Sequence, residues 1–411
     1  MTSDAAIGYS LLSAQAVRSR ALRMLALGLD DQLPHFRIEL GRLEAVVDLV
    51  QATILKNHPS LDVPFHSRWR HFAVGGRDRW ADLAAKTSWP DRAARARAEF
   101  DLAIVSVFLD AGAGPSWRYR DAASETTIGR SEGLAVASLA MFERGVFSAK
   151  PADPLRADAD ALRQLPVDAL RGGFQVCPGN PLVGIEGRAG LLRNLGGVVG
   201  ASPEIFAIND TPRPGGLFDH LAGLAVHQTI AAPTILAELL RRLGPIWPSR
   251  LMLGGVPLGD CWKHPLLVTD DATSGYVPLH KLSQWLSYSL IEPLRRAGIA
   301  VTDIDGLTGL AEYRNGGLFV DTGVLELRDP ADAAREHDVA SALVVEWRAL
   351  TVALLDRVAT RLRERLALNA ETFPLAKVLE GGTWAAGRAL AVERRPDGSA
   401  PLKVVSDGTV F

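Results

Sequence analysis

The sequence has little cysteine and no excess of charge of one sign. Of its 411 residues only two are cysteine, Cys177 and Cys261, and neither lies in a CxxC or CxxxC pair. Two isolated thiols build neither a disulfide framework nor a zinc site with several thiolate ligands. Lys+Arg 45 against Asp+Glu 47 gives a formal charge of −2, without the basic excess by which nucleic-acid-binding proteins displace counterions. We therefore predict no nucleic-acid partner.

The N-terminal segment lacks a long apolar run. Arg18, Arg20 and Arg23 interrupt its apolar positions, a pattern typical of neither a signal peptide nor a membrane span. We therefore expect a cytoplasmic protein without a membrane partner. Hydrophobic residues nevertheless make up 47% and charged residues 22%, with a mean hydropathy of +0.09. This balance excludes a disordered chain and is sufficient for a large buried core.

Helical patterns cover most of the sequence, whereas strand patterns are few. The spacing of apolar residues predicts helices over 14–29, 38–56, 93–110, 133–144, 217–242, 279–296 and 331–366. A β-hairpin is predicted over 389–411, with Pro396-Asp397-Gly398 as its turn. Residues 318–327 fit either a strand or a short helix. The predicted fold class is mainly α with minor β.

Long loops rich in Gly and Pro separate these helices, and loops of this length are usually functional or capping elements. They are predicted at 57–80, 111–130, 172–190, 203–216 and 244–278. The sequence has neither a repeat of fixed period nor a low-complexity linker. We expect one continuous helical unit, with an N-terminal lobe over 1–165 and a catalytic lobe over 166–411.

Three sequence features fit simpler interpretations better than catalytic or metal-binding ones. Residues 129–133 fit the G-x-S-x-G nucleophile elbow, but the polar stretch before Ser131 favours a helix N-cap over a buried strand and elbow. In 303–306 the Gly comes too soon after the first Asp for a calcium loop, so an acidic helix start is favoured. Nine histidines occur without HxH or HExxH spacing, so we predict neither a metal nor another cofactor.

Residues 64–72, with the sequence PFHSRWRHF, form a dense patch of cationic and aromatic side chains. It contains His66, Arg68, Trp69 and His71. A solvated loop can have the same composition, but groups this close suit an anionic or planar ligand.

A second group of candidates lies between residues 276 and 328. Lys281 is near the start of a predicted helix, where an ammonium and free backbone N–H groups can hold a phosphate. Glu312 and Asp321 lie on Gly-flanked backbone that could bring carboxylates close to a ligand. The alternative is that Glu312 and Arg314 form a structural ion pair at a helix start, and residue chemistry alone leaves both interpretations open.

Six segments are distinctive along the chain: Phe65–Trp69, Asp110–Tyr119, 130–139, 309–325, 381–388 and 406–411. Across essentially the whole chain they resemble a family of uracil-catabolism proteins, once known only as a domain of unknown function. The resemblance implies a pathway in which uracil becomes a nucleotide, a cyclohydrolase-like enzyme opens the ring, and a ribosyl-urea species precedes urea. An N-glycosidic cleavage is still needed there to release urea from ribose.

A second resemblance rests on residues 133–144, 279–284, 303–314, 322–325 and 346–349. These segments are similar to the queuosine-salvage nucleotide glycosidases, helical relatives of DNA glycosylases. This resemblance implies the same helical fold, with Lys281 on a 5′-phosphate and Glu312 close to the ribose. The sequence departs from that pattern with Glu at 312, His at 280 and Asn315-Gly316-Gly317.

Together these patterns predict a hydrolase that cleaves the N-ribosyl bond of ribosylurea or its 5′-phosphate, a small-molecule substrate, and releases urea. Glu312 is the first candidate for the catalytic carboxylate, with Asp321 or Asp303 as the second acidic group. The leaving nitrogen could take a proton or hydrogen bond from His280, His71 or Arg68. The other predicted substrate-binding residues are Lys281, Arg314, Trp69, Asp110, Glu132 and Trp384.

Two other functions would make different demands on these residues. A non-catalytic protein that carries a labile pathway intermediate would keep Lys281 and the aromatic patch but would tolerate a neutral residue at 312. An amidohydrolase would need a metal cluster or an activated nucleophile, which the spacing of His and Cys does not offer. The sequence is compatible with ribosylurea and with its 5′-phosphate as substrate, and it indicates no oligomeric state.

Overall fold

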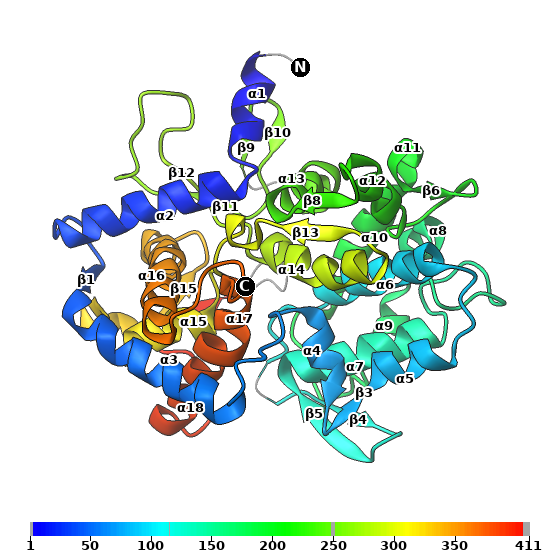
Figure 1. Ribbon diagram of the computed structural model, residues 1–411, viewed down its shortest axis with the longest axis horizontal. Coiled ribbons are helices and arrows are strands. Elements are labelled where there is room, and N and C mark those ends of the chain that lie inside the picture. The colour runs from blue at the N-terminus through cyan, green and yellow to red at the C-terminus, as the bar shows by residue number, and fades with distance from the viewer. Residues whose placement is uncertain (1–2, 115, 248–250, 406–411) are drawn as a thin grey trace.

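The computed structural model describes residues 3–114, 116–247 and 251–405, which form the mainly α fold that the sequence predicts (Figure 1). The helices are α1 (Ser3–Ser10), α2 (Ala14–Leu29), α3 (Leu43–Asn57), α4 (Arg68–Phe72), α5 (Arg79–Lys86), α6 (Arg92–Phe108), α7 (Arg130–Glu143), α8 (Ala159–Arg163), α9 (Val167–Gly173), α10 (Ile185–Ala201), α11 (Pro203–Phe206), α12 (Gly216–Leu224), α13 (Ala232–Leu243), α14 (Lys281–Arg296), α15 (Tyr313–Asp321), α16 (Ala342–Leu366), α17 (Leu375–Val378) and α18 (Trp384–Arg394).

The strands are short and occur in pairs. The antiparallel pairs are β1 (Phe36–Ile38) with β14 (Leu325–Leu327), β2 (Ala73–Val74) with β3 (Arg77–Asp78), β4 (Arg118–Asp121) with β5 (Thr126–Gly129), β6 (Ala207–Ile208) with β7 (Thr211–Pro212), β9 (Met252–Leu253) with β10 (Val256–Pro257), and β11 (Cys261–Lys263) with β12 (Tyr276–Pro278). The parallel pairs are β8 (Thr229–Ala231) with β13 (Ala300–Thr302), and β15 (Glu336–Asp338) with β16 (Lys403–Val405).

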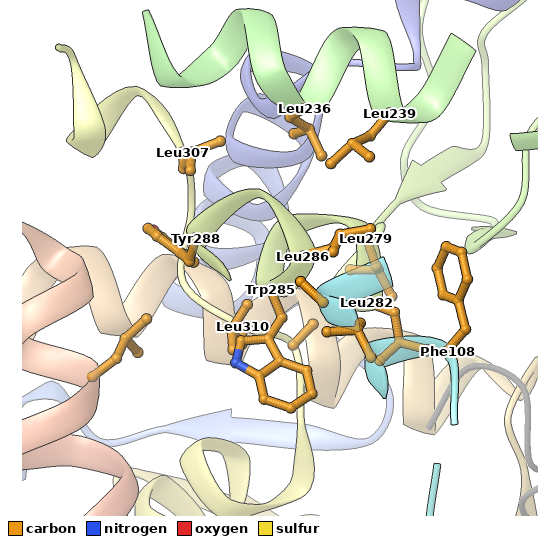
Figure 2. Packing of buried hydrophobic residues seen from close by; sticks show 14 of the residues in the cluster. Phe108, Leu236, Leu239, Leu279, Leu282, Trp285, Leu286, Tyr288, Leu307 and Leu310 are labelled. Carbon is orange, nitrogen blue, oxygen red and sulfur yellow. The ribbon is translucent and has the colours of Figure 1, made fainter. Parts of the chain in front are cut away.

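Helix α14 lies at the centre of the core. Twelve of its 16 residues are buried, as expected for a helix covered on most sides. It packs against α6 and α13, and α16 packs against α2, α3 and α15. Figure 2 shows Leu236 and Leu239 of α13 on one side of α14, with Trp285 and Leu310 toward the other. Helices from 1–165 and from 166–411 thus pack together in this core. The boundary between the two lobes at residue 165 stays a prediction.

Helix starts follow side-chain caps at several positions. The hydroxyl of Ser13 accepts from Ala16 N at 3.2 Å, and Asp91 accepts from Ala94 N at 2.6 Å. The helix predicted over 217–242 is instead two helices, because His227 and Gln228 have φ of 49° and 57°, in the left-handed region. The helices predicted from 38 and 331 begin later, after strands β1 and β15.

The predicted C-terminal hairpin over 389–411 is wrong. Its first arm belongs to α18, in keeping with the helix-forming Ala, Leu, Glu and Arg of that segment. Gly387 lets α18 approach α15 closely, because a Cβ there would lie 2.4 Å from Arg314 O. In the second arm β16 pairs in parallel with β15, and 406–411 lie outside the described residues. Residues 318–327 are divided between α15 and β14.

No helix in the described part of the chain combines the length and the apolar character that crossing a membrane requires.

Candidate functional site

A cavity of about 1020 Å³ lies where elements from both predicted lobes meet. In Figure 1, α4 and α7 lie on one side of this region and α15 and α18 on the other, with α14 above. Its charged and aromatic lining includes His66, His71, Asp110, Arg130, Glu132, Lys281, Trp285, Glu312, Tyr313, Arg314, Trp384 and Arg388. The structure thus brings together seven of the predicted site residues: His71, Asp110, Glu132, Lys281, Glu312, Arg314 and Trp384.

Lys281 is held at the start of α14 by a buried carboxylate. Its backbone N–H donates to Asp260 Oδ2 at 2.9 Å, and both Asp260 oxygens accept from the guanidinium of Arg348 at 2.8 Å. The Lys281 side chain has no hydrogen bond or ion pair with any described residue. Burial lowers the pKa of Lys281, against the opposing attraction of Glu312 and Asp110. The site therefore holds an ammonium near two carboxylates.

Glu312 caps helix α15. Its Oε2 accepts from Arg314 N and its Oε1 from Asn315 N, both at 2.6 Å. The carbonyl of Ala311 accepts from Arg348 Nε at 3.1 Å, so one guanidinium on α16 positions both Lys281 and Glu312. The alternative ion pair of Glu312 with Arg314 is not formed, since that guanidinium donates to a backbone carbonyl. A carboxylate has about four acceptor positions, so Glu312 keeps acceptor capacity after capping.

Asp110, which follows α6, is the second carboxylate of the cavity. Its Oδ2 lies 3.1 Å from Arg68 Nη1, while its buried Oδ1 has no hydrogen-bond partner among the described residues. Arg68 is fully buried behind it, does not line the cavity, and donates from Nε to Ser106 Oγ at 2.7 Å. An acceptor oxygen of Asp110 is therefore left for a ligand or water.

Two histidines and two tryptophans form an aromatic wall. The ring of His71 lies 5.4 Å from Trp285 and 6.0 Å from Trp384, and His66 lies 6.2 and 5.9 Å from the same rings. Burial and the nearby Arg68 charge lower the pKa of His71 to about 4, so its imidazole is neutral at neutral pH. This wall suits a planar, uncharged group such as a ureido group.

Sequence reasoning missed Arg130 and Arg388, which are among the arginines that line the cavity. Arg130 donates to Asp397 O at 2.9 Å, and Arg388 forms an ion pair with Glu132. Neither position has a local pattern that indicates chemistry. Both nevertheless lie in segments that carry the first family resemblance, 130–139 and 381–388.

Besides Arg68, four predicted site residues lie outside the lining of the cavity. His280 makes a hydrogen bond through Nε2 to Leu11 O at 3.0 Å, and Trp69 donates to Ser289 O at 2.7 Å. Asp321 is paired through both oxygens with Arg395, and Asp303 is exposed at the start of a short 3₁₀ turn.

Ser131 is the second residue of α7, and Gly129 rather than Ser131 is the N-cap of that helix. The strand before it belongs to the two-stranded β4–β5 hairpin. Across the described ranges, no three His, Cys, Asp or Glu side chains are grouped as metal ligands.

Comparisons with known proteins match nearly the whole chain. A sequence family described as "Protein of unknown function (DUF1688)" matches residues 10–411. Protein urg3 of Schizosaccharomyces pombe is 41% identical over 411 residues, which cover 98% of each chain. Uracil catabolism protein 4 of Lachancea kluyveri is 36% identical over 414 residues, covering 93% of each.

Proposed function

This chain belongs to the family described as protein of unknown function (DUF1688), and we propose that it acts in uracil catabolism as an N-ribosyl hydrolase. The printed name of one relative, Uracil catabolism protein 4, supports the pathway. The proposed reaction is hydrolysis of the bond between ribose C1 and the ureido nitrogen of a ring-opened pyrimidine nucleotide derivative. Its products are urea and ribose from ribosylurea, or urea and ribose 5-phosphate from the 5′-phosphate.

The observation that carries the proposal is the grouping of Asp110, Lys281 and Glu312 around one cavity with an aromatic wall. Cleavage of an N-ribosyl bond develops positive charge at C1, and fixed carboxylates stabilise that charge. The cavity thus supplies two carboxylates, one ammonium and a surface for a planar leaving group.

In the proposed mechanism, Glu312 stabilises the oxocarbenium-like transition state. The two backbone N–H groups that hold its oxygens fix the carboxylate in place before the reaction. Asp110 orients a water molecule with its free Oδ1 and accepts a proton as the water oxygen bonds to C1. The C1–N bond breaks, and the nitrogen takes the bonding electrons.

The leaving nitrogen needs a proton, and Lys281 is the proposed donor. Its lowered pKa makes the ammonium a better acid than an exposed lysine. His71 is neutral at neutral pH and is proposed to hydrogen-bond the ureido group. Arg348 is a positioning residue, because it binds Asp260, which holds the backbone of Lys281, and the carbonyl of Ala311, which precedes Glu312.

The test is release of urea by the purified chain from ribosylurea and from its 5′-phosphate, measured with and without added urease. We expect urea as the nitrogen product, so that ammonia appears only when urease is present. Ammonia without urease would indicate direct attack on the ureido group and would contradict the proposal.

The second candidate is a non-catalytic carrier of the same intermediate. It is favoured by one observation: both oxygens of Glu312 already accept backbone N–H groups, as in a purely structural helix cap. Saturable binding of ribosylurea with no urea released over many hours would select this function.

A further inference from the structure

We infer that Arg130, Arg314 and Arg388 form a phosphate subsite in the cavity, so that the substrate is a 5′-phosphorylated ribose derivative. The inference rests on the proposed function for the chemistry at C1. The phosphate subsite itself is argued only from the three guanidinium groups and their surroundings.

The three arginines come from three helices and meet at one turn. Arg130 of α7 donates to Asp397 O at 2.9 Å, and Arg314 of α15 donates to Gly398 O at 2.7 Å. Because these carbonyls belong to adjacent residues, the two guanidinium groups are held side by side. Arg388 follows Gly387, the point where α18 approaches the backbone of Arg314.

Within the described ranges, the three arginines at this end of the cavity have only one carboxylate paired with them. Arg388 pairs with Glu132, but Arg130 and Arg314 form no ion pair with a carboxylate among the described residues. Each uses one N–H on a carbonyl and keeps other donors for a ligand. Burial lowers the pKa of Arg130, and the neighbouring Arg314 and Arg388 charges lower it further, against the opposing effects of Tyr313 and Glu132.

The start of α7 adds further donors. The helix runs over 14 residues, and its N-cap, Gly129, provides no side-chain acceptor for the first backbone N–H groups. Residues 130, 131 and 132 of this first turn all line the cavity. A dianion placed among the arginines would therefore also face the positive end of the helix dipole.

Lys281 is a poorer phosphate ligand, although the glycosidase resemblance implies that role for it. Its ammonium interacts with Glu312 and Asp110, and a phosphate there would face two like charges. Placing the phosphate on the arginines leaves Lys281 beside the C1–N bond. Guanidinium groups also match phosphate oxygens in bidentate geometry better than an ammonium does.

The experiment is calorimetric titration of the full chain with ribose 5-phosphate, ribose and inorganic phosphate. We expect ribose 5-phosphate to bind and ribose to bind at least about tenfold more weakly. Arg130→Gln and Arg388→Gln should each weaken ribose 5-phosphate binding by about tenfold or more. Arg394→Gln removes an exposed arginine outside the cavity on the same helix as Arg388, and should leave binding unchanged. Circular dichroism verifies that each variant is folded.

Two results would overturn the phosphate subsite. One is equal binding of ribose and ribose 5-phosphate by the wild type. The other is a Lys281→Met variant that no longer prefers ribose 5-phosphate over ribose, while the folded Arg130→Gln and Arg388→Gln variants keep this preference. Binding needs no turnover, so the two proposals fail separately. Arginine-dependent binding of ribose 5-phosphate without urea release supports the phosphate subsite and contradicts the hydrolase. Equal turnover of ribosylurea and its 5′-phosphate supports the hydrolase and contradicts the phosphate subsite.

Discussion

Replacing Glu312 with Gln tests whether this carboxylate stabilises the transition state or only caps α15. Gln keeps one acceptor oxygen, so it can still accept from one of the two N–H groups that Glu312 binds at 2.6 Å. The other N–H would face an amide NH₂ group. The lost cap bond should cost about 1 kcal/mol of unfolding free energy.

The effect on catalysis should be much larger than the effect on stability. Removing one preorganised charge typically lowers kcat by about 10²–10³. We therefore expect Glu312→Gln to lower kcat for urea release by about that factor, with KM changing little. The assay is urease-coupled urea release with wild type and variant side by side, together with denaturant unfolding of both.

Asp91→Ala is a matched control for the loss of one cap bond. Asp91 caps α6 by accepting from Ala94 N at 2.6 Å, but it is exposed and lies outside the cavity lining. It should lose a similar amount of stability and keep full kcat. If Glu312→Gln instead behaved like Asp91→Ala, losing stability while keeping kcat, Glu312 would be a structural cap and our mechanism would be wrong.

The remaining predictions concern three other residues. Asp110→Asn should lower kcat by roughly 10²-fold or more, and should also destabilise the fold because buried Arg68 loses its carboxylate; unchanged kcat in the folded fraction would exclude Asp110 as base. The folded pKa of His71 is about 4 against 6.5 for the free group, so its contribution to stability is full above pH 6.5 and is lost as pH falls toward 4. His71→Phe should flatten this acid limb in denaturant unfolding, and an unaltered limb would refute the assignment. Arg348→Lys should lower kcat for urea release and the melting temperature together, because a lysine cannot hold both Asp260 oxygens and Ala311 O; a variant that lost neither would contradict its positioning role.

Local patterns predicted the helices well where caps and periodicity agree. The helix predicted over 14–29 is observed with the same ends, and the Ser13 hydroxyl caps its first turn. The errors lie where the backbone conformation overrides composition. Residues 227 and 228 in the left-handed region break a helical pattern, and the approach of α18 to α15 selects helix over the predicted hairpin.

The cavity was predictable in part. Segments recognised by resemblance carried Asp110, Lys281 and Glu312, which the fold brings together from the end of α6, the start of α14 and the N-cap of α15. The sequence does not show which side chains pair when they are far apart along the chain. The partner of Asp321, for example, is Arg395, 74 residues away, and the meeting of Arg130 with Arg314 depends on the turn at 397–398.

The most direct measurement follows the ureido carbon of ribosylurea 5′-phosphate labelled with a heavy carbon isotope, by NMR, in the presence of the wild-type chain. The N-ribosyl hydrolase predicts that the labelled signal moves from the substrate to free urea, with an equal amount of ribose 5-phosphate formed. A label that stays on the sugar while the compound binds, or that appears as bicarbonate without passing through urea, would contradict cleavage of the C1–N bond.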